Sequence, residues 1–311
     1  MNGYEALREA AAWIDLSARG RIRVAGEDRA RLLHAMSTNH IQELAPGHGL
    51  YAFFLNDKGR ILADALIYNL GESLFLDTEA ETKNKLFEHL DRFIIADDVT
   101  LEDETGSMAA IGIEGPKSLD IAQQLGIPFS GGKASVAVFQ EGFTARVSVT
   151  GSEGLRIFVP IAAKQELVNR LNEASVPAAT PEEARVVRLE IGYPRYGEEI
   201  SERYLVQETQ AADAVHYNKG CYLGQEIVER VRSRGQVHRL LTPVRIEGTT
   251  APAPGTKLKA DGTDVAEISS AVFSPALGWV VGLAYVRTEA THSKPAMIVA
   301  GTEPPVAAFL T

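Results

Sequence analysis

The strongest constraint on the fold is a change in the hydrophobic pattern near residue 239. Before this point, helical stretches alternate irregularly with strand-like runs, which is typical of α+β layers. Beyond Arg239, short apolar runs are separated by turns rich in glycine and proline, at residues 252–255, 261–262 and 274–278. This spacing is typical of a small antiparallel barrel or sandwich. The sequence therefore predicts an α+β core followed by a small C-terminal β-barrel, with the boundary at residues 236–242.

The periodicity of apolar residues also predicts individual elements. A turn at residues 56–59 lies between two apolar runs and predicts a β-hairpin. Thr180, Pro181 and Glu183 form a capping box at the start of a helix. Helices are expected at residues 4–14, 29–36, 79–93, 117–125, 162–174, 181–191 and from residue 225, and strands at residues 20–25, 50–55, 60–68, 74–76, 135–139, 144–149 and 155–159.

Length and charge exclude several classes of protein. With 311 residues, the chain can form two or three domains and bury a core without disulfides or metals. It carries 31 Lys and Arg residues against 41 Asp and Glu residues, and this net charge of −10 disfavours bulk binding of nucleic acid. No apolar run approaches the ~18 residues of a membrane span. The N-terminus lacks the pattern of a secretory signal, and the single cysteine suits a reducing compartment, so we expect a cytoplasmic protein.

The most unusual segment surrounds that cysteine and reads Lys219-Gly-Cys-Tyr-Leu-Gly-Gln-Glu226. Gly220 and Gly224 permit sharp turns, while Lys219 and a following helix N-terminus both favour a thiolate at Cys221. A helix that begins at Gln225 would place Glu226 and Arg230 four residues apart, as an ion pair requires. Free cysteines are often buried as small apolar groups, so both interpretations of Cys221 stay open.

Other reactions of this thiol have less support. A cysteine hydrolase needs a histidine base, and the seven histidines form no motif that identifies one. One cysteine and scattered histidines do not make a closed metal site within the chain, so no stably bound metal is predicted.

Two carboxylates are further candidates. Glu190 lies near the end of a predicted apolar helix, where a carboxylate can accept two parallel hydrogen bonds from an aminopyrimidine ring. Alternatively, it forms a solvated ion pair with Arg188 or Arg195. Asp64 alternates with Leu62 and Leu66 on one face of a predicted strand. It is therefore either a half-buried functional acid or a charge on an edge strand.

The cysteine segment resembles the signature of the YgfZ family, the folate-binding branch of the glycine-cleavage T-protein superfamily. Residues 55–64, 93–99, 114–116, 189–197 and 273–278 resemble other segments of this superfamily in the same order, including its hairpin, the strand after the helix, and the C-terminal barrel. One segment departs from the pattern. The T-protein turn Thr-Gly-Tyr-Thr-Gly-Glu is present only as Val147-Ser-Val-Thr-Gly-Ser152, without the tyrosine and the glutamate, which disfavours T-protein catalysis.

The resemblance implies a tetrahydrofolate-binding core of two related α+β halves around a central hole, at residues 1–110 and 111–238, with the barrel at 239–311. Tetrahydrofolate or a one-carbon-substituted folate would occupy the hole. By the same resemblance, Glu190 would hold the pterin, with Tyr196 in the same segment. Asp64 would lie near the folate nitrogen that carries the one-carbon unit.

The function that this resemblance implies is a folate-dependent accessory factor for assembling or repairing iron–sulfur clusters in client enzymes, including enzymes that modify tRNA. Cys221 and Lys219 would act at the mouth of the hole, and the partners would be client enzymes or cluster carrier proteins. One alternative is an aminomethyltransferase or folate-dependent demethylase with Asp64 as its catalytic residue. Another is an interaction module that binds no folate.

Overall fold

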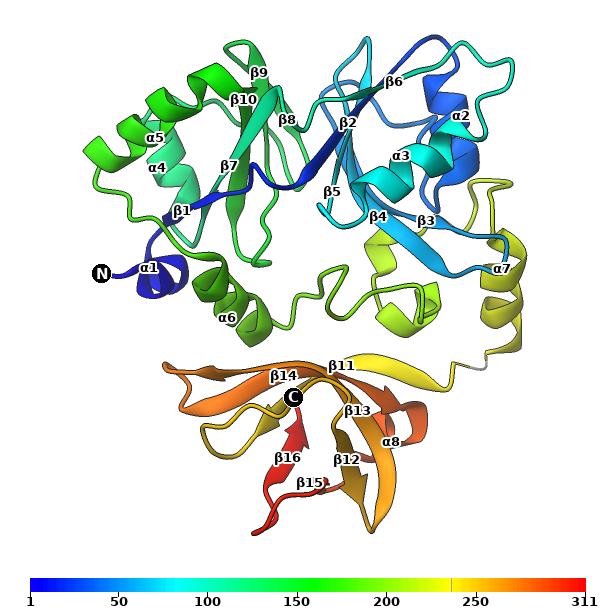
Figure 1. The fold of residues 1–311 in the computed structure, drawn as a ribbon, viewed down its shortest axis with the longest axis vertical. Helices are drawn as coiled ribbons and strands as arrows, with labels where there is room; N and C mark the ends of the chain where they lie inside the picture. Colours follow the sequence, from blue (N-terminus) through cyan, green and yellow to red (C-terminus); the bar gives the residue numbers. More distant parts are fainter. Residues whose placement is uncertain (236) are drawn as a thin grey trace.

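The computed structural model describes residues 1–235 and 237–311 and contains two five-stranded antiparallel sheets and a closed six-stranded barrel (Figure 1). The two sheets stand side by side with their helices on the outer faces, and the barrel lies beneath both (Figure 1). The predicted α+β core with a C-terminal β-barrel is therefore confirmed. Of the predicted boundary at residues 236–242, residue 236 lies outside the described residues.

The first sheet has the strand order β3-β4-β5-β2-β6. Its β3 and β4 pair in antiparallel fashion around residues 56–59, which confirms the predicted hairpin. Buried aliphatic residues such as Val24, Leu33 and Leu90 join the sheet to its two helices. The elements are β2 (Gly20–Ala25), α2 (Arg29–Met36), β3 (Gly49–Leu55), β4 (Ile61–Asn69), β5 (Leu74–Thr78), α3 (Lys83–Asp91) and β6 (Thr100–Asp103).

The second sheet has the strand order β1-β7-β10-β9-β8 and includes residues from the start of the chain. The helix expected at residues 4–14 is wrong in its second part, because α1 (Gly3–Glu9) ends early and β1 (Ala12–Asp15) pairs with β7. The expected boundary at residue 110 falls within β7, which begins at Met108. The other elements are β7 (Met108–Glu114), α4 (Ser118–Gln124), β8 (Val136–Phe139), β9 (Gly142–Ala145), β10 (Gly154–Pro160), η1 (Ile161–Ala163) and α5 (Lys164–Glu173).

Two further departures from the predicted elements involve β7 and residues 93–99. The sequence predicts no strand at β7. All seven residues of this strand are buried. A strand that is buried on both faces lacks the alternation of apolar and polar residues by which strands are recognised. Residues 93–99 resemble a strand but precede β6 in irregular structure. There, carboxylates bond the backbone directly: Asp98 accepts from the Glu27 amide at 2.9 Å and Asp28 accepts from the Asp98 amide at 2.9 Å. These bonds tie the segment to the start of α2 instead of to a neighbouring strand.

Helix α6 (Pro181–Ile191) confirms the predicted capping box, since Thr180 and Glu183 exchange side-chain-to-backbone hydrogen bonds. The segment that follows crosses between the sheets and the barrel and contains η2 (Val206–Thr209), η3 (Ala212–Ala214) and α7 (Gln225–Arg234) (Figure 1). The barrel is closed in the order β11-β14-β13-β12-β15-β16. Its elements are β11 (Arg239–Ile246), β12 (Lys257–Ala260), β13 (Thr263–Ser274), β14 (Trp279–Arg287), α8 (Thr288–Ser293), β15 (Met297–Val299) and β16 (Ala307–Leu310).

Among the described residues, no helix is both long and apolar enough to cross a membrane.

Candidate functional site

Asp64 is a buried carboxylate with one unused oxygen. It lies on β4, which has a neighbour on each side in the sheet, so it is not an edge-strand charge. The Tyr51 hydroxyl donates to Oδ2 at 2.6 Å. The other oxygen, Oδ1, is buried and has no hydrogen-bond partner among the described residues. Burial and the negative charge of Glu79 raise the pKa of Asp64 to about 6, so it can exchange a proton near neutral pH.

The expected alternation around Asp64 holds only on one side. The register shifts between Phe54 and Leu55, so that Phe54 faces Ala63 and Leu55 faces Ile61. Leu62 therefore lies in a β-bulge, without a partner in the ladder. Its side chain lines a groove beside α3. The bulge places the end of the hairpin in a different register from the segment that carries Asp64.

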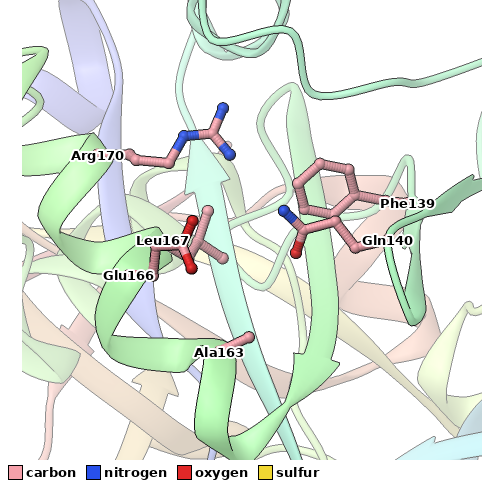
Figure 2. Close-up of a pocket in the computed structure, with 6 residues that line it drawn as sticks. All are labelled: Phe139, Gln140, Ala163, Glu166, Leu167 and Arg170. Carbon is pink, nitrogen blue, oxygen red and sulfur yellow. The ribbon is translucent and has the colours of Figure 1, made fainter.

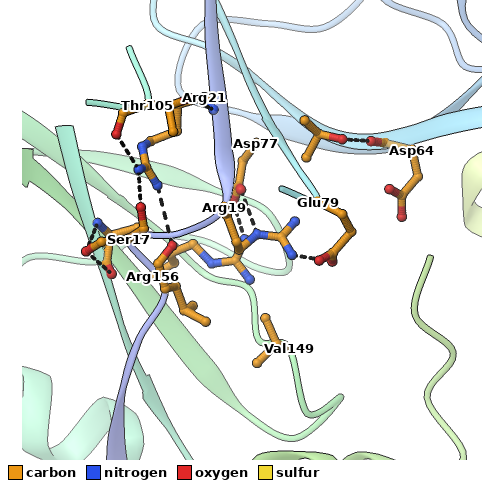
Figure 3. Close-up of polar contacts among 12 residues, drawn as sticks. Ser17, Arg19, Arg21, Asp64, Asp77, Glu79, Thr105, Val149 and Arg156 are labelled. Atoms are coloured by element: carbon orange, nitrogen blue, oxygen red, sulfur yellow. Dashed lines mark hydrogen bonds and ion pairs between the residues drawn. The ribbon is translucent and has the colours of Figure 1, made fainter. Parts of the chain in front are cut away.

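A chain of ion pairs lies beside the carboxylate and joins the two sheets (Figure 3). Arg19 pairs with Asp77 at 2.8 Å and also with Glu79, which in turn accepts from Arg195 at 2.8 Å. Asp77, on β5 of the first sheet, also pairs with Arg156, on β10 of the second. Although burial opposes the charge on Asp77, Arg156 and Arg19 outweigh it and hold the pKa of Asp77 below its usual value. The network fixes Glu79 as an ionised neighbour of Asp64.

The pKa of Asp64 predicts a pH effect on stability. An acid whose pKa is higher in the folded state than in the unfolded state binds more protons when folded. Because the pKa rises from its ordinary value of 3.8 to about 6, stability should fall as the pH rises through this window. The total loss is about 3 kcal/mol. Asparagine cannot ionise, so Asp64→Asn should not show this loss. The free energy of unfolding of the variant, relative to that of wild type, should therefore be higher at pH 7 than at pH 4. Urea denaturation at both pH values tests this, and a constant difference would contradict it.

Glu190 and Tyr196 lie in other surroundings. Glu190 accepts from the Tyr4 hydroxyl at 2.5 Å, the Ser274 hydroxyl at 2.6 Å and Arg8 at 2.9 Å, where α1, α6 and β13 meet. It therefore does not form the alternative pair with Arg188 or Arg195. Tyr196 is buried, and its hydroxyl donates to two carbonyls of β4. No hydrogen bond or ion pair within the described chain joins Glu190 to Asp64.

The loop before α7 holds Cys221 at the surface. The thiol is exposed, which excludes the interpretation of Cys221 as a buried apolar group. Gly220 has φ 92° and Gly224 has φ 82°, as expected for glycines that permit turns. Gln225 accepts from the Tyr222 amide at 3.0 Å and closes the first turn of the helix. Within the described part of α7, Glu226 and Arg230 form no ion pair, so that expectation is wrong.

Lys219 is buried beneath the loop and bonds it to the end of α2. Its Nζ donates to the carbonyl oxygens of His34 and, at 3.0 Å, of Ser37, both at the C-terminal end of α2. The same Nζ lies 4.7 Å from the centre of the Tyr222 ring. Burial lowers the pKa of Lys219 to about 8, although the nearby Cys221 opposes this shift. The ammonium therefore caps the C-terminal end of α2.

Two surface hollows lie apart from Asp64. The larger has a volume of about 340 Å³ and lies between the β3–β4 turn, α3 and Leu223, two residues after Cys221. The other is a shallow depression between Phe139 and Gln140 on one side and Glu166, Leu167 and Arg170 on the other, with no room for a water molecule (Figure 2). Neither hollow involves Asp64 or Glu190.

Several site residues were not expected from the sequence. Tyr51 and Glu79 are neighbours of Asp64, and His34 contacts Lys219. Only Tyr51 could have been found from strand pairing. Phe53 lies opposite Asp64 in the hairpin, and Tyr51, two residues from Phe53, is a diagonal neighbour of Asp64 on the same face of the sheet. In the described part of the chain, no group of three His, Cys, Asp or Glu residues is arranged to hold a metal ion.

Comparison with known proteins agrees with this architecture. The chain is 30 % identical over 297 residues to an aminomethyltransferase of Rubrobacter xylanophilus, covering 92 % of this chain and 78 % of that protein. It is 29 % identical over 303 residues to an aminomethyltransferase of a Nostoc species, covering 92 % and 79 %. The crystal structure of glycine cleavage system aminomethyltransferase T from Bartonella henselae has the same fold, with a TM-score of 0.91, 20 % identity, and coverage of 99 % of this chain and 87 % of that chain.

The family model described as the GCVT N-terminal domain matches residues 2–219, which span both sheets, Asp64, Glu190 and the start of the cysteine loop. Since this match covers well over half of the chain, the protein belongs to the GCVT N-terminal domain family.

Proposed function

We propose that the protein is a tetrahydrofolate-binding accessory factor that supports iron–sulfur cluster assembly or repair in client enzymes, including tRNA-modifying enzymes. The observation that carries this proposal is the exposed thiol of Cys221 on a loop whose neighbours hold it against α2. A folded protein that needed only a folate site would gain nothing from an exposed thiol, which is prone to oxidation. The other support is membership of a family with aminomethyltransferase relatives.

Of the residues expected to hold a folate, Asp64 has a free acceptor, whereas Glu190 is largely occupied by protein donors. Asp64 offers a buried, unpartnered oxygen, which a ring nitrogen of tetrahydrofolate would satisfy. Glu190 has three protein donors, so its carboxylate retains capacity for one more donor, and paired acceptance from a pterin requires one protein donor to leave. Tyr196 can contribute only its ring, because its hydroxyl already donates to the backbone. Bound tetrahydrofolate would supply a carrier for a one-carbon unit.

Cys221 would act on the client rather than on the folate. A single thiolate supplies at most one ligand, so any cluster is cargo and its other ligands come from the partner. Lys219 holds the loop through its hydrogen bonds to the end of α2. The partners would be client enzymes or cluster carrier proteins.

Folate binding is tested by calorimetric titration of tetrahydrofolate. Wild type and Cys221→Ala should bind equally well. Asp64→Ala should lose about 1.5–3 kcal/mol of binding free energy, the contribution of a hydrogen bond to a charged group. Glu190→Gln should lose less, because its protein donors already occupy most of the carboxylate. Absence of binding to wild type would overturn the folate assignment, and the exposed thiol would then have to be explained without it.

The accessory role is tested by Cys221→Ser in the organism that encodes the protein. Serine keeps the size of the side chain, so the fold should be unchanged, but it cannot act as a soft thiolate ligand. The activity of iron–sulfur enzymes in extracts should fall as far as in a strain that lacks the protein. The matched control is Ser233→Ala, an exposed change on α7. Full client activity in the Cys221→Ser strain would contradict the proposed role.

A second candidate function is folate-dependent aminomethyl transfer or demethylation, and Asp64 favours it. A carboxylate with a pKa of about 6 can hold a proton for, or take one from, a reacting nitrogen near neutral pH. Wild type incubated with tetrahydrofolate and an aminomethyl donor would then form methylenetetrahydrofolate and release ammonia and the free carrier, and Asp64→Asn would not. Formation of this product at equal rates by both proteins would exclude a catalytic role for Asp64.

A further inference from the structure

We propose that His34 is the positioning residue of the Cys221 loop, through reciprocal hydrogen bonds that it forms with Lys219. The His34 ring contacts the Lys219 carbonyl oxygen through Nε2 at 2.8 Å. In the other direction, the Lys219 ammonium donates to the His34 carbonyl oxygen. Each residue therefore uses its side chain to hold the backbone of the other. This role rests on the proposed function only in that Cys221 is taken to be the reacting group.

The reciprocal pair lies within a wider junction between α2 and the loop. Ser37 accepts from Lys219 at 3.0 Å, Ala35 accepts from the Leu223 amide at 3.0 Å, and Thr38 accepts from the His216 amide at 2.9 Å. The last carbonyls of a helix have no partner within the helix, so these contacts satisfy groups that would otherwise be unpaired. The loop is thus fixed on both sides of Cys221, and among the described residues His34 is the only side chain of α2 that hydrogen-bonds to the loop.

The contacts also specify the protonation state of His34. A carbonyl oxygen can only accept, so Nε2 must carry the hydrogen toward Lys219. On the other side of the ring, Nδ1 faces the amide of Gln42 at 3.5 Å and must be the acceptor. A proton on Nδ1 would point at that amide hydrogen. The junction is therefore built for neutral imidazole, and protonation of His34 weakens it.

The groups around the ring shift the pKa of His34 in opposing directions, and the net shift is downward. Burial and the Lys219 ammonium lower the pKa of His34, while its contact with the Lys219 carbonyl and the charge of Glu43 oppose this. The His40 ring lies 4.6 Å from that of His34, and the His216 ring lies 5.2 Å from that of His40. Protonation of either neighbour would add positive charge beside His34 and Lys219. Below pH 6.5 the loop should therefore loosen.

The reaction of Cys221 with 2,2′-dipyridyl disulfide tests the proposal in the intact protein. The thiolate attacks one sulfur of the reagent, a mixed disulfide forms at Cys221, and 2-thiopyridone leaves and is followed by its absorbance. Cys221→Ala, which has no thiol, gives the baseline. His34→Gln places an amide nitrogen near the position of Nε2 and keeps the donor, whereas His34→Asn is too short to reach Lys219. His48→Gln changes an exposed histidine outside the junction and is the control.

At pH 7, His34→Gln and His48→Gln should react at the wild-type rate, and His34→Asn should react about fivefold more slowly, the factor that one lost hydrogen bond represents. The wild-type rate should also fall below pH 6.5 more steeply than the loss of thiolate explains, and this extra step should vanish in His34→Gln. Equal rates and equal pH profiles in all three histidine variants would overturn the proposal. If His34→Asn does not fold, the comparison of wild type with His34→Gln still decides the outcome. The extra fall in labelling rate below pH 6.5 should be present in wild type and absent in the variant. None of these readouts depends on a client, so failure of the accessory role would leave them unchanged.

Discussion

Replacing Asp77 by alanine is expected to lower the free energy of unfolding by about 3–5 kcal/mol, the cost of leaving a buried charge without its partner. Asp77 is fully buried, and it is the only carboxylate that pairs with Arg156 within the described chain. Arg156 is 1 % exposed and cannot turn toward solvent. Because the two residues lie on different sheets, the loss should appear as one cooperative destabilisation of both halves.

Urea denaturation of three variants separates this cause from a general effect of losing charge. Lys133→Met breaks a pair with Asp213 whose side chains are 72 % and 75 % exposed, so its effect should stay below about 1 kcal/mol. Adding Arg156→Met to Asp77→Ala should recover most of the lost stability, since the unpaired charge is removed with it. If Asp77→Ala costs no more than Lys133→Met, the buried network does not hold the halves together.

The second large effect is expected from Gly224→Ala, at about 2–5 kcal/mol from left-handed backbone strain and a steric clash together. Gly224 has φ 82°, and a Cβ atom there would lie 2.7 Å from the Asn56 carbonyl oxygen and 2.9 Å from Leu55 Cβ. Backbone and Cβ atoms of a strand cannot move aside, as the end of a flexible side chain can. The substitution should therefore separate α7 from the β3–β4 hairpin and displace the Cys221 loop.

Gly220→Ala is the matched control within the same loop. Gly220 has φ 92°, but a Cβ atom there meets nothing within 4 Å. It should lose only the conformational cost of about 1–2 kcal/mol. Thermal unfolding of both variants, with labelling of Cys221 as a readout of the loop, distinguishes the two causes. Equal losses would show that contact with the hairpin contributes nothing to the position of the loop.

Local patterns were sufficient for many of the elements. The residues of α2 and β2 lie where their apolar periodicity predicts, and the capping box of α6 begins that helix at Pro181. Gly220 and Gly224 adopt the positive φ angles that their places in the cysteine segment suggested. These features depend on neighbouring residues, so a short stretch of sequence contains the information. Helix α7, which begins after the cysteine at the predicted residue 225, is another such feature.

Prediction failed where the partner of a residue is remote. Nothing near residues 12–15 indicates that they pair with β7, about a hundred residues further on, so a helix was extended over a strand. The bulge at Leu62 depends on the register between two strands, and it breaks an alternation that the sequence alone supports. Glu190 was expected to face a ligand or an arginine of its own segment, yet its partners come from α1 and the barrel.

By itself the sequence determined the fold class, the barrel and most elements. It also identified Asp64 and Cys221 as candidate functional residues. Only the tertiary structure decided the environment of each. Asp64 owes its raised pKa to burial and to Glu79, and Lys219 exchanges hydrogen bonds with a residue 185 positions away in the chain. The physical reason is that helical and strand propensity, capping and turn chemistry act between neighbours along the chain. Burial, proton affinity and the satisfaction of helix ends depend instead on groups that folding brings together.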